Sequence, residues 1–170
     1  MKLEMVHSFD VSRDTYEKNI NHPALLKMCE GRLPYVKSRV LVDVTDPTPD
    51  QRKWRFRVEA DYKMPEAAKK VIGEKLGWFE ESLFDRKEHL VRFQVLPDVF
   101  KDRYKCGGEQ LFVDTSDKTF DRVMTVDMSV SILLVGRVVE SHILDRLKET
   151  YAIEYDIQKE FFSKLQAGTL

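Results

Sequence analysis

Cysteine is scarce in this chain: only Cys29 and Cys106 occur among 170 residues, far apart and without the close spacing of metal ligands. A disulfide framework or a zinc site is therefore not expected, and both thiols are expected to be free. Long apolar runs are missing as well. The best, from Val130 to Val135, is interrupted at Ser131 and is far shorter than the roughly 20 residues that span a bilayer, so stable membrane insertion is not expected.

An excess of charge of one sign is also lacking. Lys plus Arg number 28 against 29 for Asp plus Glu, and the two signs alternate along the chain. This balance gives no basic patch for nucleic acid and no polybasic run for anionic lipid headgroups. The opening residues, Met1 to Val6, contain no charged-then-apolar leader and no small-residue cleavage site, so the predicted location is the cytoplasm.

Alternation of apolar and polar residues predicts strands over most of the chain before residue 134. The clearest is Lys53 to Tyr62, where one face is apolar and the other is charged, as in an antiparallel sheet with one wet side. No internal repeat or linker divides the chain, which favours one domain over 1–170. The other predicted strands are 2–11, 35–46, 78–85, 88–96, 104–114 and 119–130, with short helices at 13–20, 23–31 and 65–73.

The alternation also predicts which side chains share a face. In 35–46, the residues Val36, Val40, Val42 and Val44 share one face, and Lys37, Arg39, Leu41 and Asp43 share the other. If Arg86 and Lys87 form the loop of the next hairpin, Glu81 faces Arg92. The face that carries Trp78, Ser82, Phe84, Val91, Phe93 and Val95 is then the inward one, and Glu80 and His89 also point inward and need partners. Two adjacent glycines, Gly107 and Gly108, predict a bulge where the sheet bends.

One long amphipathic helix is predicted from Leu134 to Gln166. Its broad apolar stripe consists of Val135, Val139, Ile143, Leu147, Ile153, Ile157, Phe161 and Leu165, and a narrower one of Leu144, Tyr151, Tyr155 and Phe162. Three polar residues, Arg146, Thr150 and Glu154, lie in the middle of the broad stripe. They lie either at its margin, with wet ends, or toward a cavity, in which case Arg146 would pair with Glu80.

Several segments carry a resemblance to a known family: 78–85 (WFEESLFD), 95–98 (VLPD), 106–109 (CGGE), and 134–137 (LVGR) leading into 146–151 (RLKETY). With the order of elements, they resemble the START-like superfamily (SRPBCC), and most closely a bacterial family of uncharacterised START-like proteins. The resemblance implies an α+β helix-grip fold (START/Bet v 1-like). In it, a curved antiparallel sheet of about seven strands wraps round a long C-terminal helix, with two short helices after strand one.

The resemblance also implies a cavity between sheet and helix that in relatives holds lipids, sterols, polyketides or other apolar molecules. Because the superfamily also includes cyclases, aromatases and oxygenase subunits, the fold leaves the activity open. The leading hypothesis is that this cavity binds an apolar or amphipathic small molecule such as a lipid, and transport of that molecule is left open. The predicted ligand-binding residues are Trp54, Phe56, Val58, Trp78, Glu80, His89, Phe93, Met124, Met128, Arg146, Thr150 and Glu154.

Plain core packing is the competing interpretation for the aromatic and methionine residues in this set. No catalytic residue, metal or cofactor is predicted. Two other functions stay open: a cyclase or hydrolase that uses inward His89 or Glu80 as acid or base, and a ligand-free interaction module. The module would have a sealed core and an exposed apolar patch, formed by Tyr151, Tyr155 and Phe162, and self-association into a homodimer is also left open.

Overall fold

The computed structural model describes residues 1–60, 76–99, 101–131 and 136–170, without the side chains of 138 and 139. The helix predicted at 65–73 and two stripe residues, Val135 and Val139, therefore lie outside the described parts. The elements are β1 (Lys2–Phe9), α1 (Arg13–Asn19), α2 (Pro23–Cys29), β2 (Val36–Thr48), β3 (Gln51–Ala60), β4 (Gly77–Asp85), β5 (Leu90–Pro97), β6 (Tyr104–Ser116), β7 (Thr119–Val130) and α4 (Gly136–Ala167).

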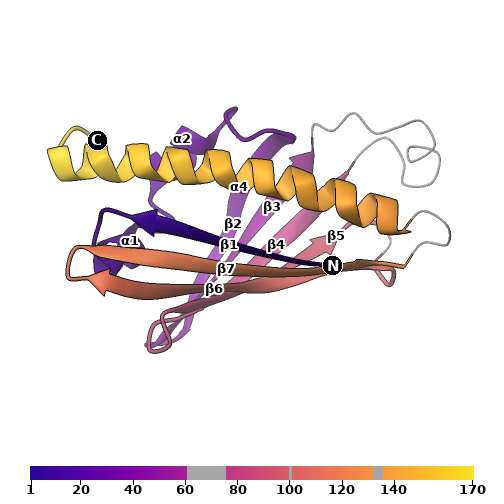
Figure 1. The fold of residues 1–170 in the computed structure, drawn as a ribbon, viewed down its shortest axis with the longest axis horizontal. Coiled ribbons are helices and arrows are strands. Elements are labelled where there is room, and N and C mark those ends of the chain that lie inside the picture. Colours follow the sequence, from indigo (N-terminus) through magenta and orange to yellow (C-terminus); the bar gives the residue numbers. More distant parts are fainter. Residues whose placement is uncertain (61–75, 100, 132–135) are drawn as a thin grey trace.

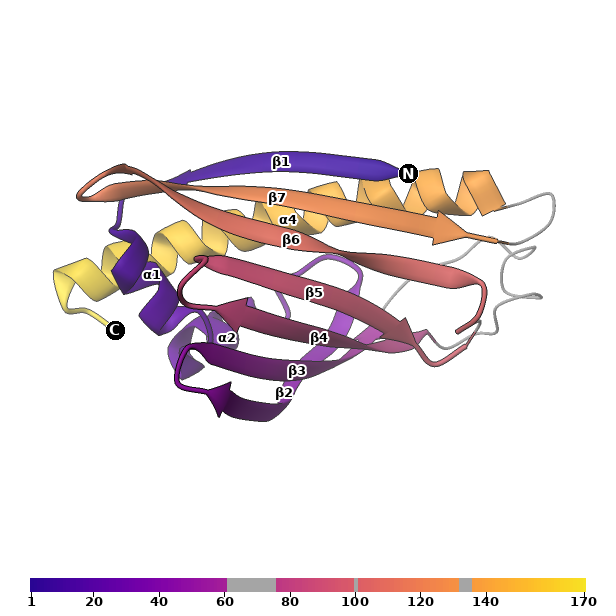
Figure 2. The ribbon, with the colours of Figure 1, turned by 90° about the horizontal axis from the view of Figure 1, so that it is seen from below.

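The strands form one seven-stranded antiparallel sheet in the order β1-β7-β6-β5-β4-β3-β2. The first strand therefore pairs with the last, and β1 and β2 are the two edges. The strands β1, β7 and β6 run at an angle to β2–β5, so the sheet is curved, and α4 lies along its concave side (Figure 1). The view from below shows β6 and β7 passing in front of α4 (Figure 2), in agreement with the predicted helix-grip arrangement.

Local sequence explains where the short helices begin. Ser12 has extended backbone angles and its hydroxyl accepts a hydrogen bond from the amide of Thr15, at 3.3 Å, as an N-cap does. Pro23 stands in the first turn of α2, where its missing N–H costs no helical hydrogen bond. No described helix is both long enough and apolar enough to cross a membrane.

The close approach of β6 to β7 depends on a glycine. A Cβ on Gly108 would lie 1.9 Å from the carbonyl oxygen of Thr125 on β7, a distance that no side chain tolerates. The predicted bulge at Gly107 and Gly108 is wrong, because both residues keep a regular register with β5 and β7. The glycines therefore allow neighbouring strands to approach closely, and they do not interrupt the pairing of the strands.

The side chains of β2 that point to the interior are not the ones that its row of valines indicates. Arg39 pairs with Val58 and Leu41 with Phe56, both of which are buried in β3, so Arg39 and Leu41 are on the inner face. The valines at 40 and 42 point outward and are 55% and 51% exposed. The predicted common face of Val36, Val40, Val42 and Val44 is wrong, because register shifts between 36 and 38 and between 41 and 43 break the alternation and place Val36 opposite Ala60 and Val44 opposite Trp54.

The hairpin of β4 and β5 has a four-residue turn, 86–89, and not the two-residue loop that was predicted. Asp85 pairs with Leu90 and Glu81 with Gln94, so the predicted pairing of Glu81 with Arg92 is wrong by two residues. A shift of two residues leaves every side chain on its face. The inward face was therefore predicted correctly, and it includes Glu80, opposite Val95.

The interior contains two apolar clusters. The aromatic cluster lies at the end of the sheet near α1 and includes Phe9, Tyr16, Trp54, Phe56, Val58, Phe84, Phe112, Phe120, Ile157, Phe161 and Phe162. The methionine cluster lies toward the N-terminal half of α4 and has a buried part, Leu3, Cys106, Met124, Val126, Met128 and Leu144. Around that part pack Met5, Phe93, Val95, Tyr104, Ile143, Leu147 and Tyr151, which are only partly buried.

Candidate functional site: a charged belt inside the grip

An ion pair between β2 and β4 spans the inner face of β3. The Arg39 Nε donates to Glu80 Oε2 at 2.9 Å, and the Trp78 Nε1 donates to the other carboxylate oxygen at 3.2 Å. The Arg39 guanidinium lies 3.8 Å from the centre of the Phe56 ring, over which it reaches Glu80. Both charged side chains are about three-quarters buried, at 23% and 27% exposed, so the pair is only partly screened by water.

A second pair of charges comes from α4 and β7 and is joined by an amide. The Gln158 Oε1 accepts from Arg122 Nη1 at 2.9 Å, and the Gln158 Nε2 donates to Glu154 Oε1 at 3.5 Å. Burial opposes the charge of Arg39, but Glu80 and then Glu154 hold its pKa above the ordinary value, so Glu154 acts on the first pair too. We call Arg39, Glu80, Glu154, Gln158 and Arg122 the charged belt.

Arg122 is the most deeply buried charge of the belt, with 2% of its surface exposed. Besides Gln158 it donates to the Tyr16 hydroxyl at 2.9 Å and to His7 Nδ1 at 2.8 Å. Burial, and next the charge of Arg122, lower the pKa of His7 to about 4. The ring is therefore neutral at pH 7 and accepts the arginine hydrogen bond, while it stacks on Tyr155 with ring centres 4.5 Å apart.

The belt lies between the two apolar clusters. On one side, Arg122 follows Phe120 and precedes Met124 on the inner face of β7, and these neighbours belong to different clusters. On the other side, Tyr104, Cys106 and Tyr151 extend from the methionine cluster. Burial, with the negative charge of Glu80 as a further cause, raises the pKa of both phenols above their ordinary range and that of Cys106 to about 11. These groups stay protonated and offer hydrogen-bond donors.

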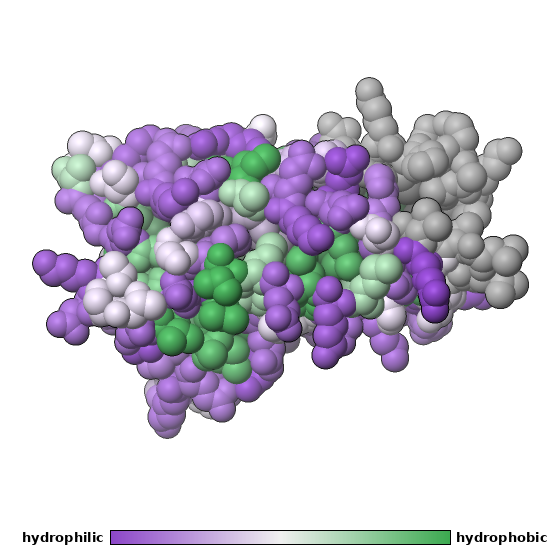
Figure 3. Space-filling model, in the orientation of Figure 1, coloured by the Kyte–Doolittle hydropathy of each residue, from purple (hydrophilic) through white to green (hydrophobic). Residues whose placement is uncertain are grey.

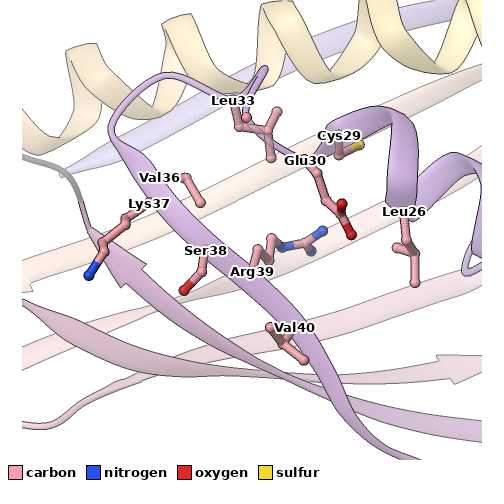
Figure 4. Close-up of a pocket in the computed structure, with 10 residues that line it drawn as sticks. Leu26, Cys29, Glu30, Leu33, Val36, Lys37, Ser38, Arg39 and Val40 are labelled. Carbon is pink, nitrogen blue, oxygen red and sulfur yellow. The ribbon is translucent and has the colours of Figure 1, made fainter.

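A groove of about 290 Å³ lies between α2 and β2 (Figure 4). Its lining includes Leu26, Cys29, Leu33 and Arg39, so one member of the charged belt is also part of a surface groove. Burial raises the pKa of the Cys29 thiol to about 11, and that thiol is therefore protonated. The volume is close to the lower end of small-molecule sites, which is about 300 Å³.

The predicted wall residues fall into different environments. Trp54, Phe56 and Val58 are buried in the aromatic cluster, Trp78 is partly buried beside the belt, and Phe93, Met124 and Met128 lie in the methionine cluster. The ring–ring contacts of the aromatic cluster are close, for example 5.1 Å between the centres of Phe9 and Phe120. The rings at that end are closely packed, and partly buried residues surround both clusters, among them Leu41 and Trp78 at the aromatic one and Phe93 at the methionine one.

Two of the predicted polar residues on α4 are not beside Glu80. Arg146 Nη1 donates to the Tyr35 hydroxyl and to Glu149 Oε2, and the Thr150 hydroxyl donates to the Pro34 carbonyl at 3.4 Å. They fasten the segment between α2 and β2 to the helix. The predicted pairing of Arg146 with Glu80 is therefore wrong, and Arg39 takes that place. Glu154, the third of the set, does face the belt.

His89 does not point into the interior. It stands in the turn between β4 and β5 with a φ of +53°, and its Nδ1 lies 2.8 Å from Glu17 Oε1 on α1. The prediction that His89 points inward is wrong, because the four-residue turn removes it from the strand. Of the two acid or base candidates, only Glu80 lies in the interior. Within the described ranges, no three His, Cys, Asp or Glu side chains gather to hold a metal.

The predicted exposed patch on α4 is also wrong. Tyr151 packs in the methionine cluster, Phe162 is buried in the aromatic cluster, and Tyr155 stacks on His7. Exposed aliphatic residues lie on strands instead. Val6 and Leu111 both pair with Val123, which makes a row across β1, β7 and β6 on the outer face, and apolar surface is visible below α4, over these strands (Figure 3).

The most informative residues of the belt, Arg39 and Arg122, were not predicted. Arg122 does carry a signal, because it has the same parity in its strand as Phe120 and Met124 and must share their face. Gln158 follows Glu154 by one helical turn and so lies on the same side of α4. For Arg39 the alternation was misleading, because two register shifts in β2 place it on the inner face while Val40 and Val42 are exposed.

Comparison with solved structures shows the same fold in proteins of low sequence identity. An aromatase/cyclase, Zhui, from Streptomyces sp. R1128 is 11% identical and has a TM-score of 0.62, with 95% of each chain covered. A START superfamily protein from Mycobacterium smegmatis is 11% identical with a TM-score of 0.59, covering 96% of this chain and 98% of the other. Norcoclaurine synthase from Thalictrum flavum is 13% identical with a TM-score of 0.63, covering 96% and 87%.

These likenesses establish the START-like fold, and identities this low establish nothing finer. No curated protein sequence matches the chain significantly. A family model does match, over residues 4–161, which is nearly the whole chain and includes every member of the charged belt. The chain therefore belongs to the family described as Protein of unknown function (DUF2505).

Proposed function

We propose that this protein binds an amphipathic small molecule, such as a lipid, between the sheet and α4. The apolar body of the ligand would lie in the methionine cluster, and its polar group would meet the charged belt at Arg39 and Glu80. The observation that carries the proposal is the uneven filling of the interior. Inward residues beside the belt, such as Trp78, Phe93 and Val95, are only partly buried, whereas the rings at the centre of the aromatic cluster contact one another closely.

The chemistry of the methionine cluster suits an apolar guest. Met5, Met124 and Met128 contribute flexible thioethers that adapt to irregular shapes, and Phe93 and Leu147 add apolar surface that is not fully buried. Covering such surface is favourable by about 25 cal/mol per Å² of apolar area. The belt then supplies the few convergent polar groups that orient a ligand in a mostly apolar site.

A solved structure of the same fold contains small-molecule ligands, which is consistent with a binding role. One structure of norcoclaurine synthase from Thalictrum flavum, 14% identical with a TM-score of 0.59, contains dopamine and hydroxybenzaldehyde and covers 94% of this chain and 87% of the other. A binding role is favoured over acid–base chemistry by the state of Glu80. Both of its carboxylate oxygens accept hydrogen bonds, from Arg39 and from Trp78, so neither is poised toward a substrate proton.

The proposal is tested with two variants of adjacent residues on β5. Val95 points inward into the methionine cluster, and Leu96 points outward and is exposed. Protein stripped of co-purified ligand is incubated with a total lipid extract and examined by native mass spectrometry. We expect wild type and Leu96→Phe to retain a ligand, and Val95→Phe to retain about tenfold less, which corresponds to about 1.4 kcal/mol.

Thermal unfolding gives a second measurement. If the space beside Val95 is available to a ligand, Phe at this position fills it and the midpoint of unfolding hardly changes. A solid core would instead lose about 1–3 kcal/mol from overpacking. Wild type that retains nothing from any extract, or a Val95→Phe protein that is strongly destabilised, would refute the proposal.

A further inference from the structure

We infer that the polar group of the ligand carries no net charge, so that an alcohol, a carbonyl compound or an amide is bound in preference to a carboxylate or an ammonium ion. This inference rests on the proposed function and makes it more specific. It follows from the balance of charge in the belt, where two guanidinium groups, of Arg39 and Arg122, face two carboxylates, of Glu80 and Glu154.

Arg39 is paired with a carboxylate directly, whereas Arg122 hydrogen-bonds to Tyr16, Gln158 and His7 and is linked to a carboxylate through an amide. Arg39 and Glu80 are in direct contact at 2.9 Å. Arg122 reaches Glu154 through the amide of Gln158, which accepts from one and donates to the other. A charged ligand would therefore bring an ion without a counter-ion into a largely buried place, or would have to separate an existing pair. Either event is unfavourable where water cannot screen the charge.

The other titratable groups next to the belt do not disturb this balance. His7 is neutral at pH 7 because its pKa is about 4. Tyr104, Tyr151 and Cys106 stay protonated because burial raises their pKa values. They remain neutral donors, and an uncharged oxygen on a ligand can accept a hydrogen bond from them without any change of protonation.

Charges farther along the interior are outside this site. Glu140, at the start of α4, accepts from the backbone amide of Val130 and lies 3.9 Å from the amino group of Met1. Arg52 shares the inner face of β3 but pairs with Phe84, on the far side of the aromatic cluster. Among the described residues, the belt is therefore balanced on its own.

The test compares three probes that share one alkyl tail: dodecanol below its solubility limit, and dodecanoate and dodecylammonium below their critical micelle concentrations. Their dissociation constants are measured at pH 7 from the change in tryptophan fluorescence, since Trp78 donates to Glu80 in the belt. We expect wild type to bind dodecanol at least about tenfold more tightly than either ion. Tighter binding of an ion by wild type would overturn the inference and leave the proposed function intact, whereas no binding of any probe would refute both.

Substitutions in the ion pair of Arg39 and Glu80 change the net charge of the belt. Glu80→Gln leaves it with an excess positive charge, and we expect the preference to move to dodecanoate. Arg39→Gln leaves an excess negative charge, and we expect the preference to move to dodecylammonium. The double variant Arg39→Gln/Glu80→Gln is balanced again, and dodecanol should again bind best. The double variant leaves no unpaired ion of this pair in the interior, so it can be measured even if a single variant fails to fold. An unchanged order of affinities in the folded single variants would overturn the inference.

Discussion

The hydrogen bond between His7 and Arg122 should make the stability of this protein sensitive to acid. In the folded chain, burial and the neighbouring guanidinium lower the pKa of His7 from 6.5 to about 4. The unfolded chain, with an ordinary imidazole, binds a proton between these two values, and the folded chain does not. The contribution of neutral His7 to folding stability is therefore fully present above pH 6.5 and is lost as the pH falls toward 4.

The size of the effect follows from the two pKa values. A difference of about 2.5 between them corresponds to at most about 3.4 kcal/mol, at about 1.36 kcal/mol for each pH unit. Because the His7 ring is only about half buried, solvent screening reduces this to about 1–2 kcal/mol. We expect the wild-type free energy of unfolding to fall by that amount more than the free energy of a His7→Gln variant, between pH 7 and pH 4.5.

The Gln variant is a suitable control because its amide oxygen can still accept from Arg122 but cannot titrate. Urea unfolding of both proteins, followed by far-ultraviolet circular dichroism at several pH values, gives the two curves. The carboxylates are common to both proteins, so their titration cancels in the difference. Equal pH dependence of the two proteins, or an NMR titration that places the His7 pKa near 6.5 in the folded state, would refute the reasoning.

Three further predictions concern the fold. Gly108→Ala should lower the free energy of unfolding by about 2–4 kcal/mol in urea titrations, because the new Cβ would collide with the backbone of Thr125; a change within about 0.5 kcal/mol would contradict the close approach of β6 and β7. Ser12→Ala should cost about 1 kcal/mol through loss of the α1 cap, again by urea unfolding, and no loss would mean that the cap is dispensable. The thiols of Cys29 and Cys106, with pKa values of about 11, should react with a disulfide reagent at pH 8 much more slowly in the native protein than in urea, and equal rates would contradict their burial.

Much of the fold is predictable because its periodicities are local. The alternation of Trp54, Phe56 and Val58 with charged residues defines β3, and the recurrence of apolar residues about every four positions in the last segment defines α4. The length of a turn is harder to predict from local sequence. The absence of glycine and asparagine from Arg86 and Lys87 is a signal against a two-residue loop, but it does not give the length of the turn, and the error moved His89 from the interior to the surface of the hairpin.

The candidate site was predicted only in part. Glu80 and Glu154 were identified as polar residues on otherwise apolar faces, and both do lie in the belt. Their partners were not found, because an ion pair between Arg39 and Glu80 crosses an intervening strand and joins residues 41 positions apart. Arg146 was chosen as the partner on helical spacing alone, but the segment between α2 and β2 holds it elsewhere.

The sequence by itself determined the order of the elements, the amphipathic long helix and the charge balance of the whole chain, since each depends on residues near one another or on composition. Only the tertiary structure decided which face of β2 is buried, which arginine meets Glu80, and where the interior is tightly filled. The physical reason is that burial and ion pairing depend on neighbours from distant strands, and the identity of those neighbours is set by register and sheet curvature, which no local pattern specifies.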